Sequence, residues 1–283
     1  MMANLLSNSY LNRELIVTSP IIEKMGMMIN RVPDHPIFIV GTGRCGTTLL
    51  VRILRSHPEI IGFPAEANAL WHPNLYPGEK AKIIIPPIEV DPQQYTEVSI
   101  KSWPPGQANK IRHTFAGFYA IWGHGKEFFV KSAMISFMIP KILEIFPDAR
   151  FVHIYRSGPP VVESFFKKNS GKYKHFKFSE DEYRLICANY WNACILEIEQ
   201  VKHSQMLEQT RAIFEISYEE LCNRPKTTLK HIADFIGVRK ESFGFDISQI
   251  ESRNYKVGDH LTDEIWEECL QVMEPGMRLK GYL

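Results

Sequence analysis

Residues 37–54 constrain the fold of this chain more than any other segment. A short apolar run with β-branched residues at 36–40 (PIFIV) is typical of a strand that is buried on both faces of a parallel sheet. A glycine-rich turn follows, after which Leu50, Ile53 and Leu54 fall on one face of a helix. The order of strand, glycine turn and helix is the first half of a β-α-β unit, so the chain is predicted to have an α/β fold.

The same alternation continues along the chain. Residues 150–155 (RFVHIY) predict a second buried strand, and residues 211–217 predict a third. A chain of 283 residues is long enough to bury a large core. We therefore expect a single domain over residues 1–283, with a central parallel β-sheet flanked by helices on both faces. The expected helices cover residues 134–146 (kinked or divided by Pro140), 180–203 and 225–236.

Two stretches depart from this pattern. Residues 1–30 are weakly patterned, so we expect them to form either a mobile N-terminal arm or a helix packed on the body of the domain. Residues 73–126 are rich in proline and hold no steady apolar period. Long connections of this kind inside an α/β domain usually form lids or binding loops, so this insertion is expected to contact a substrate.

Charge and cysteine content exclude several classes of protein. The chain carries 33 Lys and Arg against 32 Asp and Glu, so it lacks the positive field with which proteins hold a nucleic-acid backbone, and any anion site must be local. The five cysteines form no C-x-x-C pair and no zinc-type cluster, which favours reduced thiols in a cytoplasmic protein. No signal segment and no apolar run of about 20 residues is found, so no membrane partner is expected.

The glycines of the turn match a known fingerprint. Gly41, Gly43 and Gly46 have the G-x-G-x-x-G spacing of dinucleotide-binding folds, and Glu66 lies about where such folds place the acid that binds a ribose. That acid should end a second apolar strand, whereas two prolines interrupt the residues before Glu66. This disfavours an NAD-binding oxidoreductase.

A nucleotide kinase is a second hypothesis for the same turn. Such kinases need a lysine directly after the last glycine and a carboxylate at the end of another strand to hold magnesium. Here Thr47 and Thr48 follow the last glycine, and the strand at 150–155 leads into Arg156. The chain therefore lacks the groups that bind magnesium with ATP, and no metal is expected.

A third hypothesis accounts for the arginine and the threonines of the turn. Residues 41–50 (GTGRCGTTLL) resemble the 5′-phosphosulfate loop of sulfotransferases that use 3′-phosphoadenylyl sulfate (PAPS), in the arginine-bearing form of the bacterial and Golgi branches. Arg156 and Ser164 resemble the 3′-phosphate motif of that family, although Ser157 and Gly158 stand where an aspartate-proline pair is usual. The resemblance implies a P-loop-like domain with sulfotransferase activity. Shorter matches occur at 129–132 (FVKS), 217–225 (SYEELCNRP) and 253–259 (RNYKVGD).

The resemblance also implies how PAPS binds. Backbone N–H groups at a helix N-terminus favour an anion, and Arg44 can donate two hydrogen bonds to phosphosulfate oxygens. Arg156 and Ser164 would hold the 3′-phosphate, and Tyr218 would contact the adenine. The residues expected to bind PAPS are Gly43, Arg44, Cys45, Gly46, Thr47, Thr48, Arg156, Ser164, Tyr218 and Arg253.

The acceptor must lose a proton during transfer, so a base is expected near the donor. In the arginine-type branch a glutamate after the first helix has this role, and Glu66 stands at the matching place. The cytosolic branch uses histidine instead. Lys131 would assist by donating to the sulfate or to the leaving oxygen. The expected catalytic residues are Glu66, Arg44, Lys131 and His113, with His57, His72 and His124 as further candidate bases.

The acceptor itself stays open at this point. Sulfotransferases similar to this type modify sugars, lipids and natural products, so we expect a small-molecule acceptor with a hydroxyl or an amine, and release of adenosine 3′,5′-bisphosphate (PAP). The alternative from another class is a nucleotide-binding protein without turnover, which would need Arg44 and Arg156 but not Glu66. The sequence leaves open whether the chain forms a homo-oligomer.

Overall fold

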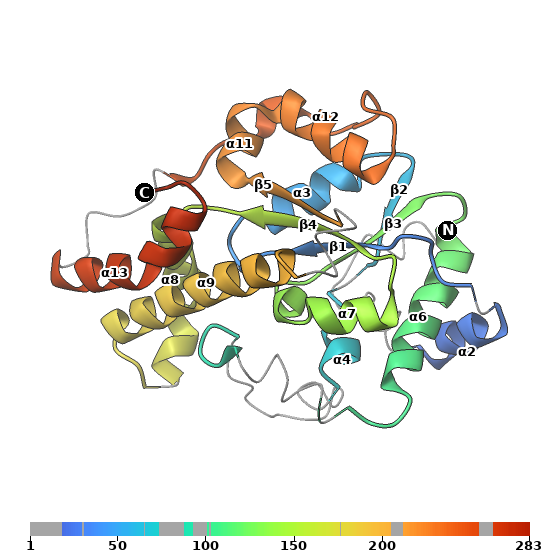
Figure 1. Cartoon of the computed structure of the whole chain (residues 1–283), viewed down its shortest axis with the longest axis horizontal. Coiled ribbons are helices and arrows are strands. Elements are labelled where there is room, and N and C mark those ends of the chain that lie inside the picture. The colour runs from blue at the N-terminus through green and yellow to red at the C-terminus, as the bar shows by residue number, and fades with distance from the viewer. Residues whose placement is uncertain are drawn as a thin grey trace.

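A five-stranded parallel sheet forms the centre of the fold in the computed structural model (Figure 1). The structure describes residues 19–29, 31–64, 66–73, 88–92, 101, 103–175, 177–204, 212–254 and 263–283, with the backbone alone at 170–175 and 263. Over these ranges, no helix combines the length and the apolar character needed to cross a membrane. The strands are β1 (Ile37–Val40), β2 (Ile60–Gly62), β3 (Glu127–Lys131), β4 (Arg150–Tyr155) and β5 (Ile213–Ser217).

The strands lie in the order β2-β3-β1-β4-β5, and every neighbouring pair is parallel. The predicted parallel sheet is therefore confirmed. At its centre, β1 pairs with β4 so that Val40 lies opposite His153. The sequence pattern does not predict β2, because Pro58 and Pro64 bound a strand of only 3 residues.

Helices cover both faces of the sheet, as predicted. On β1, Phe38 and Val40 face a core shared with α6, α7 and α9, whereas Ile37 and Ile39 face a core shared with α3 and α12. Each of these buried side chains stabilises the fold by about 1.5–3 kcal/mol. The covering helices are α3 (Thr47–Leu54), α6 (Gln107–Trp122), α7 (Ile139–Ile145), α9 (Glu180–Lys202) and α12 (Pro225–Ile236).

A third apolar cluster lies beyond the carboxyl ends of the strands. There α8 (Gly158–His175), α9 and α13 (Asp263–Leu279) pack around Trp191 and Met273, both fully buried. In Figure 1 these helices lie on the side toward which β1 and β4 point. They therefore lie beside the loops that follow these two strands.

The helix α2 (Pro20–Ile29) packs on α6 through closely apposed backbones. A Cβ atom on Gly26 would lie 1.8 Å from the carbonyl oxygen of His113, and one on Gly117 would lie 1.9 Å from that of Ile22. Only glycine fits at either crossing point. Of the two expectations for residues 1–30, the packed helix therefore holds for α2, and residues 1–18 and 30 lie outside the described residues.

Proline lies in or before two helices, α7 and α6, and affects how well the sequence predicts them. Pro140 divides the predicted helix at 134–146 into a 3-10 helix, η3 (Met134–Phe137), and α7, where it occupies the first turn. The sequence showed no steady apolar period at residues 73–126, and this interpretation is wrong for the part that forms α6. That helix buries Ile111, Phe115 and Phe118 on one face. The many prolines before α6 obscured this period. The remaining elements are α4 (Asn68–Trp71), α11 (Tyr218–Asn223) and η4 (Ile247–Gln249).

An ion network ties α13 to the sheet. Glu215 on β5 accepts hydrogen bonds from Lys202 Nζ and Lys280 Nζ, both at 2.6 Å, and contacts His153 Nδ1 at 2.8 Å. The Lys280 side chain is 3% exposed and also contacts Glu199 at 2.7 Å. Burial alone would raise the pKa of Glu215, but the hydrogen bonds from His153, Lys202 and Lys280 hold that pKa below its ordinary value.

This network predicts acid-sensitive stability. Because the folded pKa of Glu215 lies below its unfolded value of about 4.3, the carboxylate stabilises the fold fully above that pH and loses its effect as the pH falls further. We expect Glu215→Gln to lower the unfolding midpoint at pH 7 and the gap to wild type to narrow below about pH 5. Thermal unfolding across pH measures this. A gap that is constant from pH 7 to pH 3 would contradict it.

Candidate functional site

The turn after β1 depends on left-handed backbone at Arg44 (φ 68°) and Gly46 (φ 104°). A Cβ atom on Gly46 would lie 2.6 Å from Cδ2 of Tyr218, so the ring packs directly on the glycine. Gly46 is therefore required for two reasons, the backbone conformation and the close contact. It is also the residue before the first turn of α3, and its carbonyl accepts the hydrogen bond from Leu50 N–H at 3.1 Å.

The predicted loop residues differ in their contacts. The N–H of Thr47 and that of Thr48 belong to the first turn of α3, where helices leave such donors without intrahelical partners. Gly43 N–H instead donates to the hydroxyl of Tyr190 at 3.5 Å. The Cys45 thiol is buried and contacts the Thr42 carbonyl, and burial raises its pKa to about 11, so it stays a neutral packing group. Among the predicted loop residues, Gly43 and Cys45 therefore shape the turn.

Arg44 joins the turn to α8. Its Nε donates to Ser164 Oγ at 2.9 Å, so the loop after β1 and the helix after β4 meet through these two side chains. The residues lie 120 positions apart in the sequence and come from separate motifs. The structure thus brings together the two halves of the predicted phosphate site.

Arg156 follows β4 and lies beside the same turn. Its side chain is buried (5% exposed), and its Nη1 donates to the Arg44 carbonyl at 3.2 Å. Its Nε donates to Asn254 Oδ1 at 2.8 Å, and its guanidinium lies 4.5 Å from the centre of the Tyr218 ring. These contacts hold the guanidinium in one orientation without neutralising its charge.

Positive charge is concentrated at this point. Burial lowers the pKa of Arg44, and the charges of Arg156 and Arg253 lower it further, so the three guanidinium groups interact. The Arg44 guanidinium donates to a serine hydroxyl, and that of Arg156 donates to an amide oxygen and a backbone carbonyl. No ion pair joins the three arginine side chains to a carboxylate among the described residues. Like charges gathered in this way are unfavourable until an anion binds, which fits a phosphate or sulfate site.

Tyr218 has a different position from the one expected for an adenine contact. It is 4% exposed, with Gly46 and the Arg156 guanidinium packed against its ring. Its hydroxyl donates to the Glu251 carbonyl at 3.2 Å and accepts from Arg253 N–H at 3.1 Å. Tyr218 therefore braces the arginines, and its ring is covered. Most of the motif at 253–259 lies outside the described residues.

An acid-base pair lies at the neighbouring strand end. Lys131 Nζ at the end of β3 forms an ion pair with Glu66 Oε1, and their side chains are 18% and 38% exposed. Asn68 donates to the other carboxylate oxygen at 3.4 Å and accepts from Ser132 Oγ at 3.0 Å. Because β3 is adjacent to β1, the pair lies at the same edge of the sheet as the glycine turn.

The histidines are placed elsewhere or are inert. His57 contacts the Arg239 carbonyl through Nε2 at 2.7 Å and accepts from Glu59 N–H through Nδ1, so both nitrogens serve the fold. Burial lowers the pKa of His72 to about 3. His124 precedes β3, at the opposite edge of the sheet from Lys131, and His113 lies on α6 beside α2. Glu66 is the candidate base that shares an edge with the arginines.

Three residues at the site escaped the sequence analysis. Asn254 links Arg156 to the Glu219 carboxylate, and Tyr282 donates to the same carboxylate at 2.8 Å. Glu219 lies in the match at 217–225 and Asn254 in the match at 253–259, so both had an available signal. Tyr282 carries no pattern of its own.

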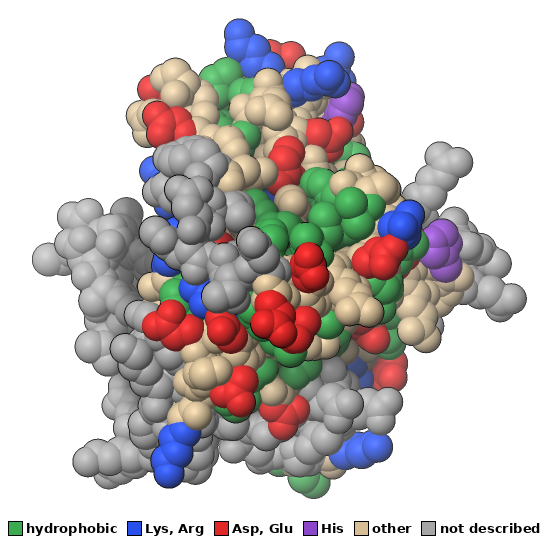
Figure 2. Space-filling view, turned by 90° about the vertical axis from the view of Figure 1, so that its left-hand side faces the viewer, with side chains coloured by type: hydrophobic (Ala, Val, Ile, Leu, Met, Phe, Trp, Pro, Cys, Tyr) green, Lys and Arg blue, Asp and Glu red, His purple; other side chains and the backbone are tan. Residues whose placement is uncertain are grey.

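The surface nearby is acidic. Figure 2, which faces the side of α13, shows Asp and Glu side chains gathered across its middle. The first turn of α9 contributes Glu180, Asp181 and Glu182. The acidic side chains on this face would not attract an anion, so on this face the attraction comes from the local arginine cluster. Among the described side chains, no group of three or more His, Cys, Asp and Glu is arranged to hold a metal ion.

Replacing Gly46 tests the turn. In Gly46→Ala the added methyl group meets Tyr218 and the left-handed backbone becomes strained, so we expect a stability loss of about 2–4 kcal/mol, measured by denaturant unfolding. Gly106 is a matched control, since it also precedes a helix with positive φ (83°) but has nothing within 4 Å of its Cβ position. Equal losses in the two variants would show that the Tyr218 contact is unimportant.

Comparisons with known proteins agree with this geometry. A model of the sulfotransferase family matches residues 36–242. The omega-hydroxy-beta-dihydromenaquinone-9 sulfotransferase Stf3 of Mycobacterium tuberculosis is 21% identical, over 84% of this chain and 75% of its own length. Protein-tyrosine sulfotransferase A of Caenorhabditis elegans is 25% identical, over 71% of this chain and 50% of its own.

Solved structures show the same fold. Sulfotransferase STF9 from Mycobacterium avium superposes with a TM-score of 0.63 at 13% identity, covering 98% of this chain and 83% of that one. STF1 from Mycobacterium tuberculosis gives a TM-score of 0.55 at 15% identity, covering 96% and 83%. The family match includes the glycine turn, Lys131, Arg156 and Ser164. This chain therefore belongs to the sulfotransferase family.

Proposed function

We propose that this sulfotransferase takes its sulfuryl group from PAPS and transfers it to a hydroxyl or an amine of a small molecule, releasing PAP. The observation that carries the proposal is the convergence of Arg44, Ser164 and Arg156 at the ends of β1 and β4. Two anionic groups of one nucleotide need two neighbouring cationic positions, and this cluster supplies them. ATP and NAD lack a phosphate at the matching 3′ position.

The donor would lie across the turn. The N–H groups that open α3, with the Thr48 hydroxyl, suit the 5′-phosphosulfate. Arg156 and Ser164 suit the 3′-phosphate. The charge of Arg253 lowers the pKa of Arg44, so Arg253 is close enough to contribute positive charge to either phosphate site. The adenine would bind beside these groups and not on the covered ring of Tyr218.

Proton transfer would fall to the pair at the end of β3. When bound, PAPS supplies the sulfuryl group, whose bond to the bridging phosphate oxygen breaks as the acceptor oxygen or nitrogen bonds to sulfur. Glu66 would take the proton that the acceptor loses. Lys131, which already contacts Glu66, would donate a hydrogen bond toward the charge that develops on the leaving oxygen.

The acceptor would approach over the insertion at 73–126. Its residues 103–107 are anchored near Glu66, since Trp103 Nε1 donates to the Trp71 carbonyl at 3.0 Å and Gln107 donates to the Leu70 carbonyl at 2.6 Å. Stf3 and protein-tyrosine sulfotransferase A are named for hydroxyl-bearing acceptors. Hydroxyl compounds are therefore the first acceptors to screen.

Nucleotide preference tests the donor site. A hydrogen-bonded, charged 3′-phosphate contributes about 1.5–3 kcal/mol, so we expect PAP to bind at least tenfold more tightly than AMP, without magnesium. Calorimetry with PAP, AMP, ATP and NAD measures this, and Arg156→Ala should remove the preference for PAP over AMP. Tighter binding of NAD or of magnesium-ATP would overturn the proposed donor.

Replacing Glu66 separates an enzyme from a binding protein. Glu66→Gln keeps the shape of the side chain but removes the base, so we expect a rate loss of about 100-fold or more with nearly unchanged PAP affinity. Transfer of labelled sulfate to a hydroxyl acceptor measures the rate. Glu144→Gln is the control, because that exposed glutamate pairs only with Lys141 on α7 among the described residues. Equal rates in all three proteins would contradict the assigned role.

A further inference from the structure

Glu219 connects three segments that are distant in the sequence. Its Oε1 accepts from the Ser157 N–H at 3.2 Å and from Asn254 Nδ2 at 2.7 Å. Its Oε2 accepts from the hydroxyl of Tyr282 at 2.8 Å. The carboxylate therefore ties the residue after Arg156, the partner of Arg156 and the segment after α13 into one network.

This network fixes the orientation of the Asn254 amide. A carboxylate can only accept hydrogen bonds, so Asn254 must turn its NH2 group toward Glu219 and its carbonyl oxygen toward Arg156. That oxygen is the acceptor for Arg156 Nε at 2.8 Å. If the carboxylate moved, the amide could rotate and present donors to a cation. The direction of the Arg156 guanidinium thus depends on the position of Glu219.

The backbone beside Arg156 is held from both sides. Trp191 Nε1 donates to the Arg156 carbonyl at 3.0 Å, and the next N–H, that of Ser157, donates to Glu219. One peptide unit therefore has both of its polar groups bound to side chains from other elements. The carboxylate of Glu219 provides one of these two hydrogen bonds.

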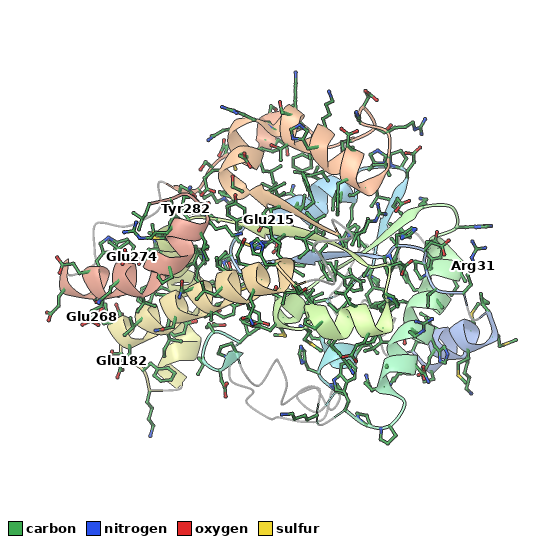
Figure 3. The ribbon with its side chains drawn as sticks, in the orientation of Figure 1. Arg31, Glu182, Glu215, Glu268, Glu274 and Tyr282 are labelled. Atoms are coloured by element: carbon green, nitrogen blue, oxygen red, sulfur yellow. The ribbon has the colours of Figure 1, made fainter. Side chains whose placement is uncertain are left out.

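Tyr282 is itself firmly placed. Figure 3 shows it just past the end of α13, and its N–H donates to the Met277 carbonyl at 2.9 Å. Its ring lies 6.2 Å from that of Tyr155, edge to face, and the nearby Lys280 is anchored by Glu199 and Glu215. Burial raises the pKa of Tyr282, and the charge of Glu219 raises it further, so the hydroxyl remains a donor at all working pH values.

We propose that Tyr282 is a positioning residue for recognition of the 3′-phosphate, acting through Glu219 and Asn254 on Arg156. Tyr282 touches neither the donor nor the acceptor in this scheme. Tyr282 fixes the position of the Glu219 carboxylate. That carboxylate fixes the Asn254 amide and the Ser157 backbone, and these two groups fix the orientation of the Arg156 guanidinium. The inference rests on the proposed function, because it assigns the 3′-phosphate to Arg156.

The test is the affinity of Tyr282→Phe for PAP and for AMP, measured by calorimetry without magnesium. Losing one hydrogen bond to a charged group should weaken PAP binding about three- to tenfold. AMP lacks the 3′-phosphate, so its affinity should not change, whereas a general loss of structure would weaken both ligands. Tyr119→Phe is the control, since its hydroxyl donates to the exposed Lys126 carbonyl far from the cluster.

A double-mutant cycle tests the route. If Tyr282 acts through the amide, then Tyr282→Phe should weaken PAP binding less than twofold when Asn254 is already alanine. Full additivity, or an equal loss for PAP and AMP, would overturn the positioning role while the proposed function stands. A wild-type protein that binds PAP no better than AMP would overturn the proposed function itself, and the positioning role with it.

Discussion

The parallel pairing of β1 with β4 is the constraint on which the site depends. The two strands leave the sheet at the same edge, with Val40 opposite His153. The chain after β1 turns through the glycines, and the chain after β4 reaches Arg156 within the same few ångströms, close enough to bond the Arg44 carbonyl. If any other strand lay between β1 and β4, this contact could not form. The order of the strands in the sheet therefore places the two segments that carry the arginines next to each other.

Neutral partners keep the charge of that cluster available. A guanidinium bonded to a carboxylate is already neutralised, whereas Arg44 bonds a serine and Arg156 bonds an amide, a carbonyl and the face of a tyrosine. Glu219 does not pair with the arginine directly. Its carboxylate accepts a hydrogen bond from Asn254, which in turn bonds Arg156. The site thus fixes the direction of its cations while leaving the free energy of charge pairing for the ligand.

The parts of the site that have a short-range sequence pattern could be predicted from the sequence. The glycine turn, Arg156 with Ser164, and Glu66 were predicted from spacing and family resemblance, and the structure brings them to one edge of the sheet. Tyr282 could not be predicted, because its bond to Glu219 spans 63 residues and depends on how α13 docks. Tyr218 was assigned to the adenine from the family resemblance of residues 217–225, and the sequence gives no sign that Gly46 and Arg156 pack against its ring.

The contact between α2 and α6 differs in kind from the one between α13 and the sheet. At Gly26 and Gly117 the two helix backbones approach so closely that a Cβ atom on either glycine would meet a backbone carbonyl. On the opposite flank, α13 is held through Lys280 and two carboxylates. Acid, which protonates carboxylates, would therefore weaken the α13 flank, whereas a single methyl group at either glycine would disrupt the packing of α2 on α6. The two flanks of the molecule thus respond to different perturbations.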